Sequence, residues 1–332
     1  MSIGSPEMHR DAQLTDKQSR ASQLSRYVQI ARPDHWIKNV FVLPGMASAV
    51  AFTPLTESFW AVPVTILSTC LIASANYTIN EFLDSHHDRH HPTKSRRPGA
   101  MGLLDWRLVI LEYILLAGVA ITLISLINVP LIIMSFVFLS MGLIYNIPPL
   151  RTKDYPYLDV LSESINNPIR FLLGWFAINS YFLPPSSILF AYWMGGAYLM
   201  AMKRYSEYRR IDDRKIAMLY RKSFAGYSKK SLLLCSFFYA LCASFFIGVF
   251  LIKYKAEFVL TFPLFAVLFT WYLWIALKPD SAAQAPETLY HEFYFLIFAA
   301  ALFVFSIILF YVEIPFLALL SDTKLIPIRL PL

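Results

Sequence analysis

The chain has few charged residues, few glycines and few cysteines. Only 15% of its 332 residues are charged and 57% are hydrophobic, a balance that excludes an ordinary soluble domain. Its three cysteines, Cys70, Cys235 and Cys242, form no CxxC pair and lack the ligand spacing of a zinc site. We therefore expect the cysteines to be packing residues, and the composition predicts a polytopic membrane protein.

Long apolar windows predict the architecture. A helix needs roughly 20 apolar residues to cross a hydrocarbon core about 30 Å thick. Windows of this kind predict an all-α bundle of nine transmembrane helices near residues 40–57, 60–83, 108–127, 129–146, 160–182, 187–203, 231–252, 257–277 and 292–312. Residues 1–26 are polar and lack the apolar core of a signal peptide, so we expect a disordered cytoplasmic segment followed by one transmembrane domain at 27–332.

The positions of the basic residues predict the orientation. Arg170 lies within a predicted helix, and only four of the other Lys and Arg residues fall on the side opposite the amino terminus: Lys253, Lys255, Lys324 and Arg329. Because cytoplasmic loops collect Lys and Arg, we expect a multi-pass membrane protein with a cytoplasmic amino terminus. Such loops and anionic lipid account for the net charge of +7, so we expect no nucleic-acid partner.

Carboxylates gather at the end of the second apolar window. Helical periodicity places three of them and an amide on one stripe: Asn80, Glu81, Asp84 and Asp88. Crowded carboxylates repel one another unless cations bridge them, and Mg²⁺ takes a few such oxygens together with water and substrate phosphate. Lys94 and Arg97 follow directly, and both residue types bind phosphate. The segment therefore predicts a clamp for a metal-bound diphosphate.

A second polar face lies on the fifth window. Asp159, Glu163, Asn166 and Arg170 follow one another at intervals of four, three and four residues, so they share one side of a helix. Charged groups against lipid cost several kcal/mol, and this face should border a bundle interior or an aqueous cavity. A structural ion pair between Glu163 and Arg170 is the alternative. By topology both acidic clusters emerge on the same side, where they could share one or two Mg²⁺ ions.

Several other polar residues permit two interpretations. Lys203, Arg204 and Glu207 end the sixth window, where they either meet a phosphate or anchor the helix at the membrane surface. Lys38 follows an interfacial segment that contains Trp36. A zinc site or a solvated helix end explains a cluster of histidines, although the adjoining Asp residues suit harder ions: His86, His87, His90 and His91.

The chain resembles the UbiA superfamily of membrane transferases. The family pattern NDxxDxxxD, followed by TKxRP, corresponds to residues 80–88 and 93–98, with Glu81 where the family usually has Asp. The substitution keeps the charge but lengthens the side chain by one methylene. Within the superfamily, the chain is similar to the decaprenyl-phosphate phosphoribosyltransferases and to rhizobial nodulation proteins, through short stretches that begin at Arg32, Tyr145, Leu158, Lys203 and Ala285.

The resemblance implies a function, a cofactor and a set of site residues. It implies transfer of 5-phosphoribose from phosphoribosyl diphosphate to a membrane polyprenyl phosphate, a step towards lipid-linked arabinofuranose, and it leaves room for a homo-oligomer. It implies Mg²⁺ held by Glu81, Asp84, Asp88, Asp159 and Glu163. It implies that the catalytic residues are Asp84, Asp88, Asp159 and Arg170. It implies substrate contacts from Lys38, Asn80, Lys94, Arg97, Tyr145, Asn166, Lys203 and Arg204.

Two other functions remain open at this point. A UbiA-type prenyltransferase would use the same clamp to move a polyprenyl group from its diphosphate to an aromatic acceptor. A transporter or channel would place Glu163 and Arg170 along a pathway, but it leaves the charged residues between 80 and 98 unexplained.

Overall fold

The computed structural model describes residues 24–89, 94–211, 213–279, 281–284 and 286–320. All regular elements within these ranges are helical, beginning with a helix over residues 24–31. The α-helices that follow are α2 (Leu43–Phe52), α3 (Ala61–Asp88), α4 (Trp106–Ser125), α5 (Val129–Asn146), α6 (Leu158–Ser164), α7 (Asn166–Phe176), α8 (Ser186–Ile211), α9 (Arg214–Tyr220), α10 (Lys229–Tyr254), α11 (Phe262–Leu277) and α12 (Phe293–Tyr311). Short 3-10 helices between them are η1 (Pro33–Val42), η2 (Lys94–Arg96), η3 (Thr152–Asp154), η4 (Lys222–Gly226), η5 (Ala256–Thr261), η6 (Ala282–Gln284), η7 (Pro286–His291) and η8 (Pro315–Leu320).

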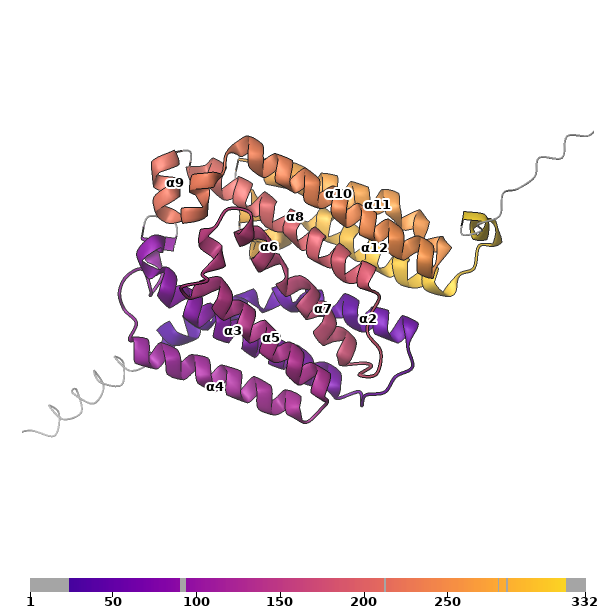
Figure 1. Cartoon of the computed structure of the whole chain (residues 1–332), viewed down its shortest axis with the longest axis horizontal. Helices are drawn as coiled ribbons and strands as arrows, with labels where there is room; N and C mark the ends of the chain where they lie inside the picture. Colours follow the sequence, from indigo (N-terminus) through magenta and orange to yellow (C-terminus); the bar gives the residue numbers. More distant parts are fainter. Residues whose placement is uncertain (1–23, 90–93, 212, 280, 285, 321–332) are drawn as a thin grey trace, which may run out of the picture.

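The helices form two layers. Helices α2 to α5 and α7 make one layer, and α8 and α10 to α12 make the other (Figure 1). Helix α8 packs along α10 and also contacts α6 and α7, so it joins the two layers. Helix α9 lies at one end of the molecule and contacts α3, and α6 packs against α8 (Figure 1). The charged ends of α3, α6 and α8 therefore meet where the layers join.

Six helical segments are long and apolar enough to cross a membrane, counted over the described residues. They are α3, α4, α5, α10, Ala256–Leu277 and α12, and they coincide with six of the predicted spans. The other three spans are built differently: α2 is only 10 residues long, the span at 160–182 is divided into α6 and α7, and α8 ends in charged residues. The protein is a multi-pass membrane protein, while nine crossings and cytoplasmic loops stay predictions.

A proline explains the division of the fifth predicted span. Pro168 has no backbone N–H to donate to the carbonyl of Ser164, so the helical ladder lacks that hydrogen bond beside the boundary between α6 and α7 at Ile165. The polar face predicted on one helix is consequently shared between two. Asp159 and Glu163 belong to α6, and Asn166 and Arg170 belong to α7.

Glycines allow α2 and α7 to approach backbone to backbone. A Cβ atom on Gly45 would collide with the carbonyl of Phe171, and one on Gly174 would collide with the carbonyl of Val42. The two helices are therefore fixed against each other without intervening side chains. This contact fixes α7, and with it Arg170, relative to the first layer.

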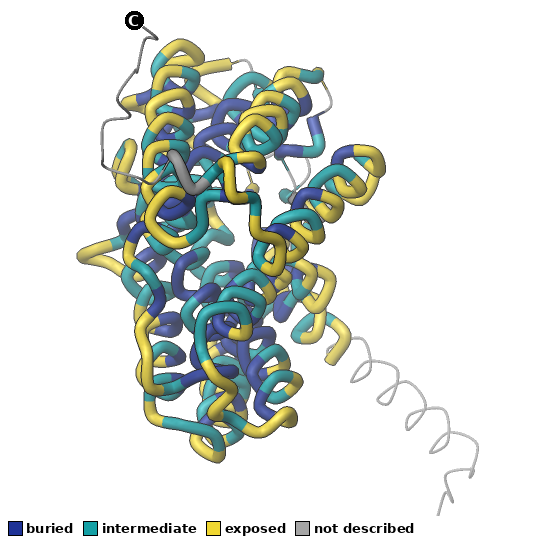
Figure 2. The backbone as a smooth tube through the Cα atoms, turned by 90° about the vertical axis from the view of Figure 1, so that its right-hand side faces the viewer, coloured by how far each residue is buried: buried dark blue, intermediate teal, exposed yellow. Residues whose placement is uncertain are grey.

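The buried residues lie mainly in the interior of the bundle. Buried residues line the interior of the bundle, whereas exposed residues cover its outer surface (Figure 2). The exposed positions of α4, α10 and α12 carry large apolar side chains such as Ile114, Phe237 and Ile308, as expected for surfaces that face lipid. All but three residues of the predicted disordered segment 1–26 lie outside the described residues. Residues 24–26 begin a helix, and the disorder of the segment stays a prediction.

Candidate functional site

A large cavity lies where the two layers meet. Its volume is about 1820 Å³, and its lining changes along its length. Charged residues from the ends of α3 and α8 and from the neighbouring loops line one part, and apolar residues such as Phe250, Leu302 and Phe310 line another. The cavity therefore suits a ligand with an anionic head and an apolar tail.

The acidic stripe of α3 faces this cavity in part. Asn80, Asp84 and Asp88 are among its lining residues. The Asp84 carboxylate accepts hydrogen bonds from Lys153 Nζ at 2.5 Å and from Arg151 Nη2 at 3.2 Å. Burial lowers the pKa of Lys153 to about 8, although the attraction of Asp84 opposes this shift. Asp84 is thus held by two cations from the loop after α5.

Basic residues after α3 join the two layers at the cavity. Arg97 Nη1 donates to Asp88 Oδ2 at 3.0 Å. Lys94 forms an ion pair with Glu207 of α8 at 3.6 Å and donates a hydrogen bond to the hydroxyl of Tyr220 on α9. The phosphate-binding residues predicted behind the acidic stripe therefore line the same cavity as that stripe.

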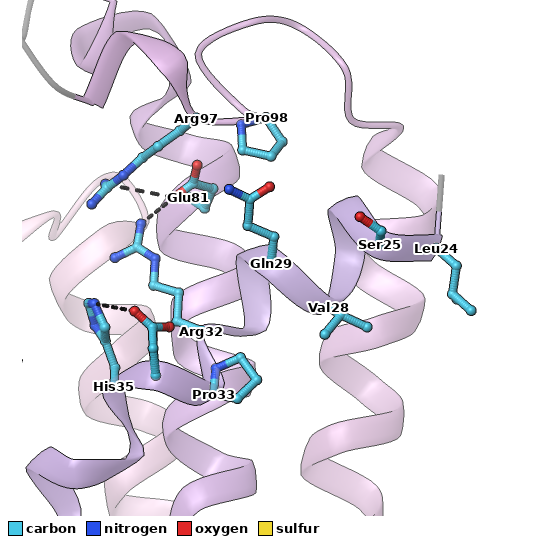
Figure 3. Close-up of a pocket in the computed structure, with 11 residues that line it drawn as sticks. Leu24, Ser25, Val28, Gln29, Arg32, Pro33, His35, Glu81, Arg97 and Pro98 are labelled. Carbon is cyan, nitrogen blue, oxygen red and sulfur yellow. Dashed lines mark hydrogen bonds and ion pairs between the residues drawn. The ribbon is translucent and has the colours of Figure 1, made fainter. Parts of the chain in front are cut away.

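Glu81 lies apart from the other carboxylates of α3. It pairs with Arg32 and lies 3.7 Å from Arg97 Nη1. These three residues border a smaller cavity of about 730 Å³ beside the helix at residues 24–31 (Figure 3). Glu81 does not line the larger cavity. Its role as a metal ligand stays a prediction, and its contacts hold two arginines that line both cavities.

The residues predicted on the second polar face take different positions. Glu163, Asn166 and Arg170 line the large cavity. Arg170 Nε donates to Asn39 Oδ1 at 2.9 Å, and its guanidinium carbon lies 4.9 Å from the centre of the Phe138 ring. Glu163 and Arg170 do not form an ion pair within 4.0 Å in the described part of the chain.

Asp159 is fully buried and lies outside the lining of the cavity. Its oxygens accept hydrogen bonds from Arg204 Nε at 3.1 Å, from Ser223 Oγ at 3.0 Å and from the Tyr227 hydroxyl at 2.7 Å. Its role as a metal ligand therefore also stays a prediction. In this arrangement, Asp159 orients Arg204.

Arg204 is the centre of a buried network. Besides Asp159, it contacts Glu207 Oε2 at 3.1 Å and donates to the Tyr145 hydroxyl at 3.1 Å. Tyr145, Arg204 and Glu207 also line the cavity. Charges buried in this way are stable only when they are paired and hydrogen-bonded, so the network holds Arg204 in one orientation.

The remaining predicted substrate residues also reach the cavity. Lys38 and Lys203 line it, and Lys38 Nζ lies 3.0 Å from His35 Nδ1. Asn80 Nδ2 donates to Asn146 Oδ1 at 2.6 Å, which ties α3 to α5.

Four basic residues that line the cavity were not among the predicted site residues. They are Arg151, Lys153, Arg221 and Lys222. Lys153 and Arg151 contact Asp84, and Lys222 forms an ion pair with Asp154 at 3.2 Å. A signal was present, because these residues follow the fourth and sixth apolar windows on the predicted side of the acidic clusters.

The oxygen donors fit Mg²⁺ bound together with a phosphate. No three His, Cys, Asp or Glu side chains in the described ranges are close enough to hold a metal by themselves. Mg²⁺, however, is usually held by one or two carboxylates and completes its octahedron with water and substrate phosphates. Asp84, Asp88 and Glu163 offer such oxygens, and Asn166 Oδ1 is buried without a hydrogen-bond partner. Of the histidines considered for zinc, His90 and His91 lie outside the described residues.

The fold and the cavity define an integral-membrane protein whose cavity lining suits an anionic ligand with an apolar tail. Comparison with known proteins identifies the family. A model of the UbiA prenyltransferase family matches residues 40–296, and the chain belongs to this family.

Individual relatives include proteins named decaprenyl-phosphate phosphoribosyltransferase. The one from Mycolicibacterium smegmatis is 30% identical over 214 residues, which cover 63% of this chain and 64% of that protein. The one from Mycobacterium tuberculosis is 27% identical over 218 residues, which cover 68% of that protein. The nodulation protein NoeC of Azorhizobium caulinodans is 35% identical over 75 residues, which cover 22% of this chain and 24% of that protein.

Solved structures agree on the fold. A UbiA homologue from Archaeoglobus fulgidus bound to DMAPP and Mg²⁺ superimposes with a TM-score of 0.66 at 21% identity, over 87% of this chain and 100% of that one. The same homologue bound to GPP and Mg²⁺ has the same TM-score over 86% of this chain and 100% of that one. These likenesses show the all-helical UbiA fold.

Proposed function

We propose that the protein transfers 5-phosphoribose from phosphoribosyl diphosphate to a polyprenyl phosphate and releases diphosphate. The names of the curated relatives support this reaction, and the cavity offers a site for both substrates. The lipid head and the soluble donor would meet at the charged part of the cavity. We place this part at the cytoplasmic surface.

The observation that carries the proposal is the charge of the cavity. Twelve basic and six acidic side chains line it, so cations outnumber carboxylates twofold. A prenyl donor brings one diphosphate, whereas phosphoribosyl transfer brings a diphosphate, a ribose 5-phosphate and a lipid phosphate. Cations and buried anions must nearly balance where little water is present. The larger number of phosphates matches the cation excess better.

We assign the metal to the carboxylates that line the cavity. Asp84 and Asp88 of α3 and Glu163 of α6 would hold Mg²⁺, which neutralises the diphosphate as negative charge develops on it. Lys94 and Arg97 would hold diphosphate oxygens, and Arg170 would approach them from α7. Glu81 and Asp159 would act through arginines, by fixing Arg97 and Arg204.

The apolar part of the cavity supports the lipid acceptor. Aromatic and aliphatic side chains from α10, η5 and α12 line it, which suits a polyprenyl tail. The phosphate of such a lipid is ionised at neutral pH, so its oxygen attacks the ribose carbon without a general base. The task of the protein is therefore orientation and charge stabilisation.

A second candidate function is prenyl transfer to an aromatic acceptor. The family description and the solved structures with DMAPP or GPP favour it. It predicts that label moves from a polyprenyl diphosphate to an aromatic ring.

Radiolabel separates the two candidates. Membranes that contain the protein are incubated with labelled phosphoribosyl diphosphate, a polyprenyl phosphate and Mg²⁺, and lipid-soluble label is measured. We expect label in the lipid for the wild type, loss of label for Asp84→Asn, and full activity for Glu313→Gln, an exposed carboxylate after α12. Absence of labelled lipid in the wild type would refute the phosphoribosyl assignment.

A further inference from the structure

Arg221 differs from every other arginine that lines the large cavity. Six of these arginines donate a hydrogen bond to, or form an ion pair with, a side chain of the protein: Arg32, Arg97, Arg151, Arg170, Arg204 and Arg210. Arg221 has no such partner among the described residues, and its Nε atom is buried without an acceptor. Three carboxylates attract it over a distance, and each contacts another cation directly: Glu207 and Asp159 pair with Arg204, and Asp84 pairs with Lys153.

Aromatic rings hold the Arg221 side chain in place. Its guanidinium carbon lies 5.6 Å from the centre of the Tyr220 ring and 5.9 Å from that of Phe224. Both rings are buried, and the hydroxyl of Tyr220 is fixed by Lys94. Cation–π contacts of this kind orient a guanidinium and leave its donors available. The side chain is therefore preorganised towards the cavity without an ion pair.

The segment that carries Arg221 lies across the charged end of the cavity. Helix α9 and η4 connect α8 to α10, and contacts with the other layer fix them there (Figure 1). His87 Nδ1 lies 3.2 Å from the carbonyl oxygen of Leu219, and Lys222 pairs with Asp154. Arg221 is thus a fixed wall residue at the point where polar head groups would enter.

We propose that Arg221 binds a phosphate monoester group, apart from the subsite of the metal-bound diphosphate. A metal needs carboxylates around it, and Asp84 and Asp88 supply them on α3. Arg221 has no carboxylate in contact, so it suits a phosphate that arrives without a metal, to which a guanidinium donates two parallel hydrogen bonds. This inference rests on the proposed function, in which two substrates carry such a group. They are the donor, through its 5-phosphate, and the lipid, through its phosphate.

The test compares Arg221 with a cation in the same segment that is exposed. Full-length protein is purified as wild type, Arg221→Gln, Arg221→Lys and Lys215→Gln, whose side chain is exposed on α9. Binding of ribose 5-phosphate, ribose, farnesyl phosphate and farnesol is measured by calorimetry. We expect Arg221→Gln to weaken binding of a phosphorylated probe about 10-fold to 100-fold, the usual effect of losing a charge-assisted hydrogen bond. Arg221→Lys should lose less, and Lys215→Gln should match the wild type.

The arms of the experiment identify the source of the phosphate. A loss confined to ribose 5-phosphate, with a higher KM for phosphoribosyl diphosphate, assigns Arg221 to the donor. A loss confined to farnesyl phosphate, with a higher KM for the lipid, assigns it to the acceptor. Equal affinities of wild type and Arg221→Gln for both probes would overturn the proposal.

Two further measurements separate folding and function from this inference. Phenylglyoxal modification of wild-type Arg221, followed by mass spectrometry, needs no variant. We expect ribose 5-phosphate or farnesyl phosphate to protect the residue, and modification at the same rate with and without them would contradict the proposal. If the wild type transfers no phosphoribose but still binds a monoester through Arg221, the proposed function fails and the binding residue stands.

Discussion

Replacing Asp159 tests whether this carboxylate orients Arg204 or holds the metal. Asp159 accepts three hydrogen bonds in a site closed to solvent, and one of them comes from a guanidinium. Removing one partner of a buried ion pair costs about 3–5 kcal/mol, because the other charge is left without compensation. We therefore expect both Asp159→Asn and Asp159→Ala to destabilise the protein by an amount in this range.

The geometry ranks the two substitutions. An asparagine can turn its Oδ1 towards Arg204 and Ser223 and its Nδ2 towards the Tyr227 hydroxyl, which has lone pairs to accept it. Asp159→Asn should therefore lower the free energy of unfolding by about 3 kcal/mol, and Asp159→Ala should lower it by about 5 kcal/mol. Thermal unfolding of the purified protein in detergent measures the order, with the alanine variant unfolding at the lower temperature.

The dependence of transfer on Mg²⁺ decides between the two roles. Because Asp159 does not line the cavity, we expect the Mg²⁺ concentration for half-maximal transfer to stay unchanged in Asp159→Asn. Asp84→Asn, which alters a lining carboxylate, should raise it. If Asp159→Asn raised the Mg²⁺ requirement as much as Asp84→Asn and kept the wild-type unfolding temperature, our reasoning would be refuted and Asp159 would be a metal ligand.

Three further predictions address packing, Glu81 and the metal. Gly174→Ala should cost about 1–3 kcal/mol through a backbone collision between α2 and α7, seen as a lower unfolding temperature. Gly118→Ala, in open space on α4, should not lower the unfolding temperature, because it introduces no collision and alanine favours the helix. Equal losses in the two variants would contradict the packing argument. Glu81→Asp shortens the side chain that reaches Arg97, so the KM for phosphoribosyl diphosphate should rise. The Mg²⁺ concentration for half-maximal transfer should stay unchanged, and a change in it would make Glu81 a metal ligand. Chelation should abolish transfer, and Mg²⁺ but not Zn²⁺ should restore it; activity that survives chelation would exclude the metal.

The sequence predicted the helical class and the meeting of the two polar clusters, because both depend on local pattern and topology. Apolar length located α3, α4 and α5, and the hydrogen bond between Asn80 and Asn146 joins the ends of α3 and α5. The same reasoning treated residues 160–182 as one helix. Pro168 was visible in the sequence, but whether a proline bends or divides a helix depends on what packs around it.

The spacing of the carboxylates could not predict which of them line the cavity and which pair with arginines. Helical periodicity places Glu81 and Asp84 close together on one stripe, yet Glu81 pairs with Arg32 and Asp84 lines the cavity. Asp159 is likewise taken by Arg204, a residue 45 positions later in the chain. Such partners depend on how distant helices pack, and a stripe on one helix carries no information about them.

The ion pairs between the layers make the two parts of the chain dependent on each other. Asp159 and Lys94 lie in the part of the chain before α8, and their partners Arg204 and Glu207 lie on α8. If the chain were cut within residues 177–185, each fragment would carry stranded charges into the bilayer, where they are most costly. We expect neither fragment to insert stably alone, and complementation only when both are synthesised in the same cell.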